Sequence, residues 1–213
     1  MNINIGMKAP DFSAMSTFGP IKLSDYKGQW VILFSHPGDF TPVCTTEFVA
    51  FAEVDEQFKA LNAQLIGLSI DSNPSHLAWV NQIYTLTGVQ IPFPVIADRM
   101  AEIAKLYGMI APDTSTQETV RNVYFIDPEQ TVRAILIYPL TNGRNIPEIL
   151  RLLTALQVTD KCKLVTPANW QPGSAGMVPP PRTYDQMVER INDPESMDLN
   201  CMDWFWCYKD SKC

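Results

Sequence analysis

Two apolar runs stand out in the pattern of hydrophobic and polar positions, the unbroken run Trp30–Phe34 and the largely apolar run Leu65–Ile70. Such runs are typical of central strands in a sheet that is covered on both faces. Between them, apolar residues recur at roughly helical spacing, at Phe48, Phe51, Ala52, Phe58 and Leu61. The pattern therefore predicts a strand–helix–strand unit at the centre of the fold.

Strands and helices continue to alternate along the chain. A short strand and turn are expected over 21–26, before the first long strand. The elements expected later are a helix beginning at Asn73, a brief strand over 94–97, a helix over 103–106 that stops at Gly108, strands over 120–126 and 132–138, and a helix beginning at Ile146. The turn over 127–130 joins the last two strands as a hairpin. This order predicts an α/β fold with a mixed sheet and helices on both faces.

Composition changes near residue 160. Six prolines follow, at positions 167, 172, 179, 180, 181 and 194. A segment so rich in proline does not extend a sheet interior or a long helix, so we expect an extended arm. The final stretch, 201–208, is strongly aromatic and would expose a large apolar patch if it were free. We therefore expect a domain over 1–160 and, over 161–213, an arm and tail that pack on a partner subunit.

Length and charge narrow the possible functions. The chain has 213 residues, of which 46% are hydrophobic and 18% charged, and its formal net charge is -7. This composition is that of a globular protein, and the negative charge argues against nucleic-acid binding. No apolar run approaches the length of a membrane span, and the first residues lack the pattern of a secretory signal. We expect a cytoplasmic protein whose five cysteines serve chemistry rather than a static disulfide framework.

One cysteine lies where a thiol would be reactive. Thr41 is a suitable N-cap and Pro42 a suitable first residue for the helix that follows Trp30–Phe34. Cys44 then falls in the first turn, where unpaired N–H groups and the helix dipole favour an anion. It also lies at the carboxyl end of a strand, where open α/β sheets place ligands. Placement alone leaves two interpretations open, a reactive thiolate and a small buried apolar residue.

Arg121 is the second unusual residue. In the strand expected over 120–126, alternation places it on the face of Val123 and Phe125. A guanidinium on an apolar face is costly unless it is paired. It either forms a structural salt bridge with an acid or provides a fixed cation for a thiolate.

The segment from Pro37 to Phe48, PGDFTPVCTTEF, resembles the active-site loop of the peroxiredoxins. The preceding Phe34-Ser35-His36 points to the subfamily related to one-cysteine and archaeal-type two-cysteine members. Other stretches match the family in order along nearly the whole chain: Ala9–Phe12, Gly67–Asp71, Ile91–Pro94, Tyr138-Pro139, Gly143–Asn145 and Pro167–Trp170. One departure is Gly38, where animal one-cysteine members carry arginine, so no contact made by that arginine is carried over.

The resemblance implies a thioredoxin-like fold and a thiol peroxidase reaction without a cofactor or a metal. It makes Cys44 the peroxidatic cysteine, Thr41 a hydrogen-bonding partner of the peroxide, and Arg121 the group that stabilises the thiolate and the transition state. It also implies that Pro37 and Pro42 shield the pocket, and that supporting contacts come from His36, Glu47 and Arg144. The backbone N–H groups of Val43 and Cys44 are further candidate donors. The lipase activity credited to animal members is not carried over, because the chain shows no local G-x-S-x-G motif.

The C-terminal tail resembles the cysteine-aromatic tail of archaeal-type two-cysteine members. By that resemblance Cys207 resolves the sulfenic acid of Cys44 across a subunit boundary. Cys201 is a candidate to take the disulfide afterwards, and Cys213 is a candidate relay. Cys162 is expected to be a plain thiol.

Three alternatives to a peroxidase are a metal-binding tail, a disulfide oxidoreductase and a non-enzymatic assembly. The spacing of six between the tail cysteines is unlike the tight pairs of zinc sites. A disulfide oxidoreductase of thioredoxin type needs a C-x-x-C motif at the helix start, which is absent here. A redox-sensing or chaperone-like assembly on the same fold stays open as the alternative. For the enzyme we expect hydrogen peroxide and organic hydroperoxides as substrates, a thiol reductant such as thioredoxin, and a homodimer that a ring of five dimers could extend to a decamer.

Overall fold

The computed structural model describes residues 3–211. It forms two compact units, of which the first ends at Ile146 and the second begins at Pro147. The boundary expected near residue 160 falls inside a helix, α5 (Ile146–Cys162), and so does not coincide with this division.

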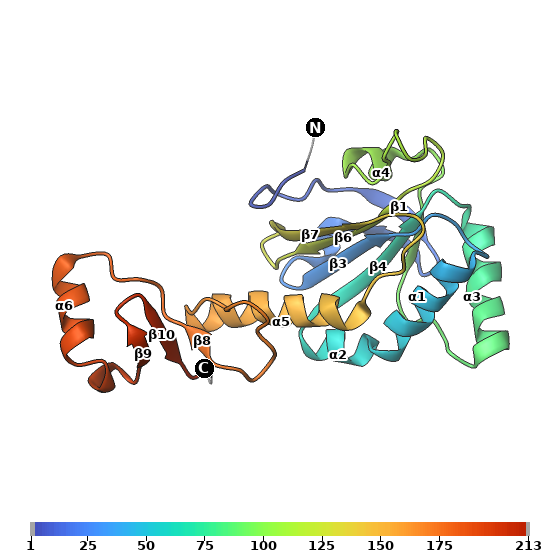
Figure 1. The fold of residues 1–213 in the computed structure, drawn as a ribbon. Helices are drawn as coiled ribbons and strands as arrows, with labels where there is room; N and C mark the ends of the chain where they lie inside the picture. The colour runs from blue at the N-terminus through green and yellow to red at the C-terminus, as the bar shows by residue number, and fades with distance from the viewer. Residues whose placement is uncertain (1–2, 212–213) are drawn as a thin grey trace. The chain divides into compact units, whose positions relative to one another are not determined.

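A seven-stranded mixed sheet organises the first unit (Figure 1). Its spatial order is β2-β1-β5-β4-β3-β6-β7. The strands are β1 (Ser13–Ser16), β2 (Gly19–Lys22), β3 (Trp30–Ser35), β4 (Ala63–Ser69), β5 (Val95–Ala97), β6 (Arg121–Ile126) and β7 (Val132–Tyr138). The neighbours β3, β4 and β5 run parallel, whereas β6 is antiparallel to β3. The sheet therefore brings the start of β6 beside the carboxyl end of β3.

Helices cover both faces of this sheet. In chain order the helical elements are η1 (Leu23–Tyr26), α1 (Pro42–Glu53), α2 (Asp55–Ala60), α3 (Asn73–Thr87) and α4 (Glu102–Leu106). Alternation along β3 decides which side chain meets which helix. Phe34 stacks on Phe51 of α1, with ring centroids 4.3 Å apart, whereas Leu33 joins a buried cluster with Ile103 of α4. The mixed sheet with helices on both faces is thus confirmed.

The predicted strand–helix–strand unit and the hairpin are also confirmed. Strand β4 is paired in parallel with β3 along the whole length of β3, and β6 and β7 form the antiparallel hairpin. Over 21–26 the expected short strand is the end of β2, which stops at Lys22, and the 3-10 helix η1 stands where the turn was expected. The pattern there is weak because β2 is an edge strand with alternately exposed positions.

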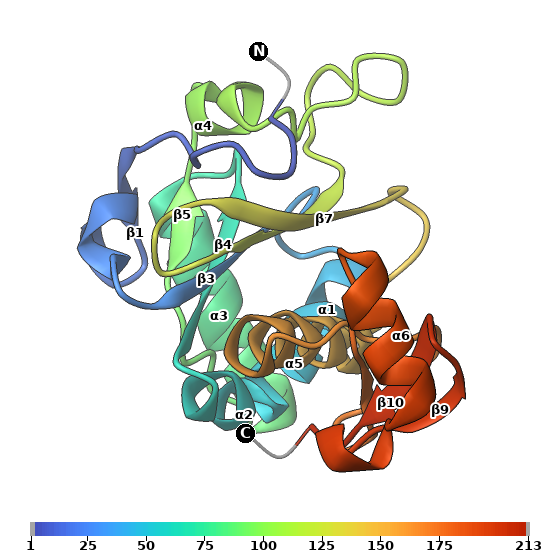
Figure 2. The ribbon, with the colours of Figure 1, turned by 90° about the vertical axis from the view of Figure 1, so that its left-hand side faces the viewer.

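The second unit contains more regular structure than an extended arm. After α5 come β8 (Gly176–Met177), α6 (Tyr184–Asn192), η2 (Glu195–Met197), β9 (Asn200–Asp203) and β10 (Trp206–Lys209), and the three strands form a small sheet in the order β8-β10-β9 (Figure 1). Figure 2 shows α6, β9 and β10 of this unit from another side. The prolines flank α6 instead of interrupting it. Thr183 caps this helix by accepting a hydrogen bond from the Gln186 N–H.

Within residues 3–211, none of the helices combines the length and apolar character that a membrane crossing requires.

Candidate active site

The loop between β3 and α1 places Cys44 in the first turn of α1, where its side chain is fully buried. Thr41 occupies the N-cap and Pro42 the first helical position, as the sequence predicts. The Thr41 hydroxyl does not cap the helix, because it donates to the Gly38 carbonyl at 2.9 Å. The backbone N–H groups of Val43 and Cys44 lie in the first turn, where a helix supplies no acceptor of its own.

Arg121 reaches the sulfur of Cys44. Its Nη1 lies 3.3 Å from Cys44 Sγ, although 77 positions separate the two residues. The pairing of Phe34 with Val123 puts Arg121, two residues earlier, beside the end of β3 and next to the loop that carries Cys44. Two hydrogen bonds from Nε and Nη2 to the Leu140 carbonyl, at 3.1 and 2.8 Å, fix the plane of the guanidinium.

Glu47 joins two buried arginines. Its Oε2 accepts from Arg121 Nη1 at 2.8 Å and from Arg144 Nη2 at 2.6 Å. Its Oε1 accepts from the Arg144 backbone N–H at 2.8 Å and from Nε at 3.0 Å. The same Nη1 of Arg121 therefore contacts both the Glu47 carboxylate and the Cys44 sulfur.

The Arg144 guanidinium is fixed by hydrogen bonds and by contact with an aromatic ring. Arg144 Nη1 donates to the carbonyls of Ser35 and Asn122, and the guanidinium carbon lies 5.0 Å from the Phe34 ring centroid. Burial lowers the pKa of Arg144, and the adjacent Glu47 carboxylate acts in the opposite direction. Arg144 thus orients Glu47, which in turn orients Arg121.

A buried cluster of two histidines and one acid lies behind the loop. His36 Nε2 and Asp39 Oδ1 are 3.0 Å apart, and His76 Nδ1 lies 2.9 Å from Asp39 Oδ2. Ser75 adds a hydrogen bond to Asp39 at 2.7 Å, and His36 stacks on Trp79. The family resemblance points to His36, but Asp39 and His76 were not predicted as site residues. Asp39 was visible as part of the loop motif, whereas nothing in the sequence linked His76 to it.

The ring nitrogens of His76 are already engaged. Nδ1 faces the Asp39 carboxylate, and Nε2 lies 3.1 Å from the Ile96 carbonyl. His36, Asp39 and His76 bring potential metal ligands within 4.8 Å of one another. Their mutual hydrogen bonds give the cluster a structural explanation, the fixing of the loop that carries Cys44.

This cluster predicts lower stability in acid. Burial lowers the pKa of His36, with Asp39 opposing it; burial alone would raise the pKa of Asp39, but hydrogen bonds from both histidines hold it below its ordinary value. Folding lowers both pKa values, so at acidic pH the unfolded chain binds more protons than the folded chain does. This difference begins near the ordinary pKa values of the two groups, about 6.5 for histidine and about 3.9 for aspartate. The free energy of unfolding should therefore fall on acidification through these values.

Urea denaturation at about pH 7.5 and about pH 5 measures the histidine part of this effect. His36→Gln lacks the titrating ring and should show a smaller loss of stability between these two values. An unchanged pH dependence in His36→Gln would show that another group is responsible.

The remaining predicted residues lie around the same loop. Pro37 is buried and Val43 half-buried, whereas Pro42 is exposed, so of the two prolines only Pro37 is enclosed. A cavity of about 320 Å³ opens beside Thr41 and Pro42, and its other walls are Phe40, Thr45, Trp79, Gln82, Ile83 and Leu86.

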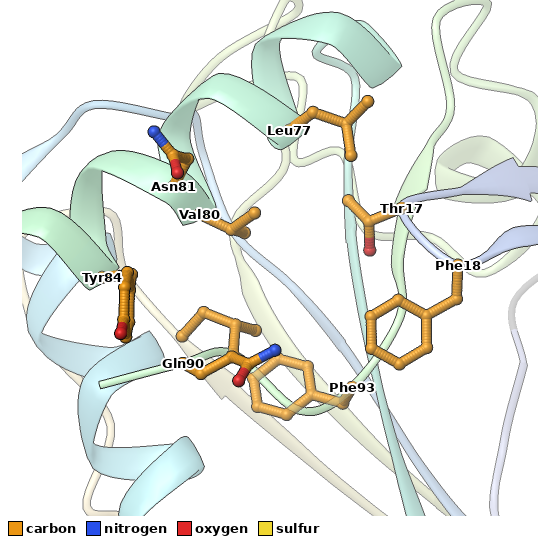
Figure 3. Close-up of a pocket in the computed structure, with 9 residues that line it drawn as sticks. Thr17, Phe18, Leu77, Val80, Asn81, Tyr84, Gln90 and Phe93 are labelled. Carbon is orange, nitrogen blue, oxygen red and sulfur yellow. The ribbon is translucent and has the colours of Figure 1, made fainter. Parts of the chain in front are cut away.

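A second pocket, of about 350 Å³, lies between α3 and the β1–β2 turn (Figure 3). Phe18, Phe93 and Tyr84 supply much of its wall, together with the amides of Asn81 and Gln90. Neither Cys44 nor any residue hydrogen-bonded to its sulfur lines this pocket. It is therefore separate from the site around Cys44.

The tail cysteines are in a different state from Cys44. Cys201 and Cys207 face each other across β9 and β10 and form a disulfide, whereas Cys44 is a free thiol. In this state neither tail sulfur is open to a metal. Cys162 was expected to be a plain thiol, but its sulfur takes part in a disulfide. The candidate relay Cys213 lies outside the described residues.

Comparisons with known proteins give the family of this chain. The AhpC/TSA family pattern matches residues 5–135, and the pattern of the C-terminal domain of 1-Cys peroxiredoxin matches residues 155–193. The chain is a peroxiredoxin. Among curated relatives, peroxiredoxin 2 of Caldanaerobacter subterraneus subsp. tengcongensis is 60% identical, with 96% of this chain and 92% of the relative covered. A peroxiredoxin of Aquifex aeolicus is 52% identical, with 96% of each chain covered.

Solved structures agree with this assignment. The crystal structure of a mutant of the peroxiredoxin 6 of Arenicola marina superposes with a TM-score of 0.87 at 36% identity, covering 99% of each chain. A yeast mitochondrial 1-Cys peroxiredoxin gives a TM-score of 0.84 at 38% identity, covering 98% of this chain and 99% of the other. This peroxiredoxin therefore has the thioredoxin-like fold and is a thiol-dependent peroxidase.

Proposed function

We propose that Cys44 is the peroxidatic cysteine and that Arg121 and Thr41 align the peroxide with it. The 3.3 Å contact between Arg121 Nη1 and Cys44 Sγ supports this proposal most directly. The thiolate attacks the terminal oxygen of the peroxide, the O–O bond breaks, and the other oxygen leaves as hydroxide or alkoxide and takes up a proton. Cys44 is left as a sulfenic acid.

The donors around Cys44 match the charge that develops during this step. Arg121 is fixed by Glu47 and Leu140, so its N–H groups need no reorganisation as negative charge spreads onto the leaving oxygen. Thr41 donates to the Gly38 carbonyl, which leaves its oxygen lone pairs free to accept from the peroxide O–H. The N–H groups of Val43 and Cys44 supply further donors at the positive end of α1.

The proposed substrates are hydrogen peroxide and organic hydroperoxides, with a thiol reductant such as thioredoxin. The solved yeast mitochondrial 1-Cys peroxiredoxin is described as resolved through glutathione/thioredoxin systems, which supports testing both reductants here. Assembly as a homodimer, extended to a decamer, belongs to the same proposal, as does docking of the second unit on a partner subunit.

Peroxide consumption by the purified full chain tests this function. Hydrogen peroxide and an organic hydroperoxide are supplied in turn, each with thioredoxin, glutaredoxin and glutathione systems. Catalytic turnover with at least one reductant is expected. Suppression of aggregation of a denatured client without peroxide turnover would instead support the redox-sensing or chaperone-like alternative.

Resolution of the sulfenic acid is assigned to Cys207 of a partner subunit. Cys44 is fully buried, so the first turn of α1 must unwind before its sulfur meets a distant thiol. Attack by Cys201 on the mixed disulfide then releases Cys44 and leaves the Cys201–Cys207 pair. The disulfide between those two residues supports this order, since it is the product expected of the exchange.

Cys207→Ser should prevent the Cys44-linked dimer that forms after one equivalent of peroxide. The protein is first reduced and then treated with peroxide, and non-reducing gel electrophoresis measures the amount of disulfide-linked dimer. Cys201→Ser is the matched control and should accumulate this dimer. A Cys207→Ser chain that still forms the dimer would overturn the assignment.

A further inference from the structure

The loop after β7 holds a dipeptide that is chemically labile. Asn142-Gly143 is the one Asn-Gly pair in the 213 residues, and both residues are exposed. Asparagine is a thermolabile residue, and glycine after it offers the least steric hindrance to a reaction between its backbone nitrogen and the side-chain amide. This makes the loop a candidate for spontaneous modification.

Neighbouring groups favour that reaction. The Thr141 hydroxyl donates to Asn142 Oδ1 at 2.7 Å, which polarises the carbonyl and would stabilise the oxyanion formed when a nucleophile adds. Among the residues that the structure describes, none accepts a hydrogen bond from the Gly143 N–H. The nucleophilic nitrogen is therefore not held by another partner, and the electrophilic carbon is activated.

We propose that Asn142 is a site of self-modification by deamidation. The Gly143 backbone nitrogen loses its proton and attacks Asn142 Cγ, forming a C–N bond, and ammonia leaves. The five-membered succinimide then adds water at either carbonyl and opens to aspartate or to isoaspartate. No oxidant or reductant takes part, since water is the only co-reactant.

Isoaspartate would disturb the buried arginine pair. Isoaspartate adds one methylene to the backbone before Gly143. Val43 lies close beside this glycine, because a Cβ on Gly143 would be 3.4 Å from Val43 Cγ1. The next residue, Arg144, donates its backbone N–H to Glu47 Oε1 at 2.8 Å. The longer backbone displaces this donor, and Glu47 then no longer orients Arg121 as it does now. This consequence for activity rests on the proposed role of Cys44 and Arg121.

Incubation of the reduced full chain, followed by peptide mass spectrometry and enzymatic methylation of isoaspartate, tests the modification. The wild type should accumulate isoaspartate at position 142, and Asn142→Gln should not. Thr141→Val should slow the reaction about fivefold, the effect of one hydrogen bond on a rate. A native chain that stays unmodified while the urea-unfolded chain reacts would overturn the proposal, and an unchanged rate in Thr141→Val would overturn the role of the hydroxyl.

Peroxide turnover of the same samples tests the consequence. The wild type should lose activity in proportion to the isoaspartate that forms, while Asn142→Gln incubated in parallel keeps its activity. Full activity in a largely modified sample would overturn the coupling to Glu47. If the fresh chain has no peroxidase activity, the proposed function fails, and the isoaspartate measurement still decides the modification.

Discussion

Arg121→Ala is expected to lower the second-order rate of peroxide reduction by about 10²–10³-fold, the effect of losing one fixed donor to a developing oxyanion. In the present structure the guanidinium contacts Cys44 Sγ and is held by Glu47 and Leu140. Thr41 and the backbone N–H groups remain in the variant, so part of the activity should survive. Stopped-flow mixing of reduced protein with peroxide measures the rate of the first step.

Thiol ionisation alone is too small to explain such a loss. An ordinary thiol with a pKa of about 8.5 is about 3% ionised at pH 7, so complete ionisation speeds attack by at most ~30-fold. The pH dependence of thiol alkylation in Arg121→Ala gives the change in ionisation separately. Arg121→Lys is the matched control, because lysine keeps the positive charge but lacks the planar guanidinium group with its several N–H donors. This variant should restore the ionisation of the thiol more fully than the rate of peroxide reduction. If thiol ionisation and the rate of peroxide reduction fall by the same factor, Arg121 acts only by favouring the ionised thiol.

Glu47→Gln is expected to destabilise the fold by about 3–5 kcal/mol, because removing one partner of a buried ion pair leaves uncompensated charge. Here the loss falls on two guanidinium groups, those of Arg121 and Arg144, which both bond Glu47 Oε2. Without the carboxylate they repel each other in a region from which water is excluded. The free energy of unfolding by urea measures the effect.

Glu56→Gln provides the control for this measurement. Glu56 forms an ion pair with Lys59 at 2.8 Å, but its side chain is 86% exposed. Exposed pairs of this kind contribute roughly 0–1 kcal/mol. If Glu47→Gln costs no more than Glu56→Gln, the buried pair does not stabilise the site as argued.

The central sheet and the separate placements of Cys44 and Arg121 were predictable from local pattern. The apolar run Trp30–Phe34 marked β3, and the Thr-Pro pair before Cys44 marked the start of α1. Period-two alternation placed Arg121 on the face of Val123 and Phe125, and its contacts with Cys44 and Glu47 of α1 show which helix that face meets. The family resemblance, rather than the pattern, connected Arg121 with Cys44.

The supporting network was less predictable because it depends on contacts distant in sequence. Asp39 meets His76 across 37 positions, and Arg144 meets Glu47 across 97. Neither pair has a periodicity that a single sequence would reveal. Helix α6 was not predicted for another reason. The segment is rich in proline as a whole, but the prolines lie before and after the stretch Tyr184–Asn192, which contains none.

Mass spectrometry after a single equivalent of peroxide, with a sulfenic-acid trap present, tests the central claim most directly. The reduced chain should carry the trapped adduct on Cys44, and the amount should fall when Arg121 is replaced. A chain that consumes peroxide while the adduct forms on Cys162, Cys201 or Cys207, with Cys44 left unmodified, would contradict the account.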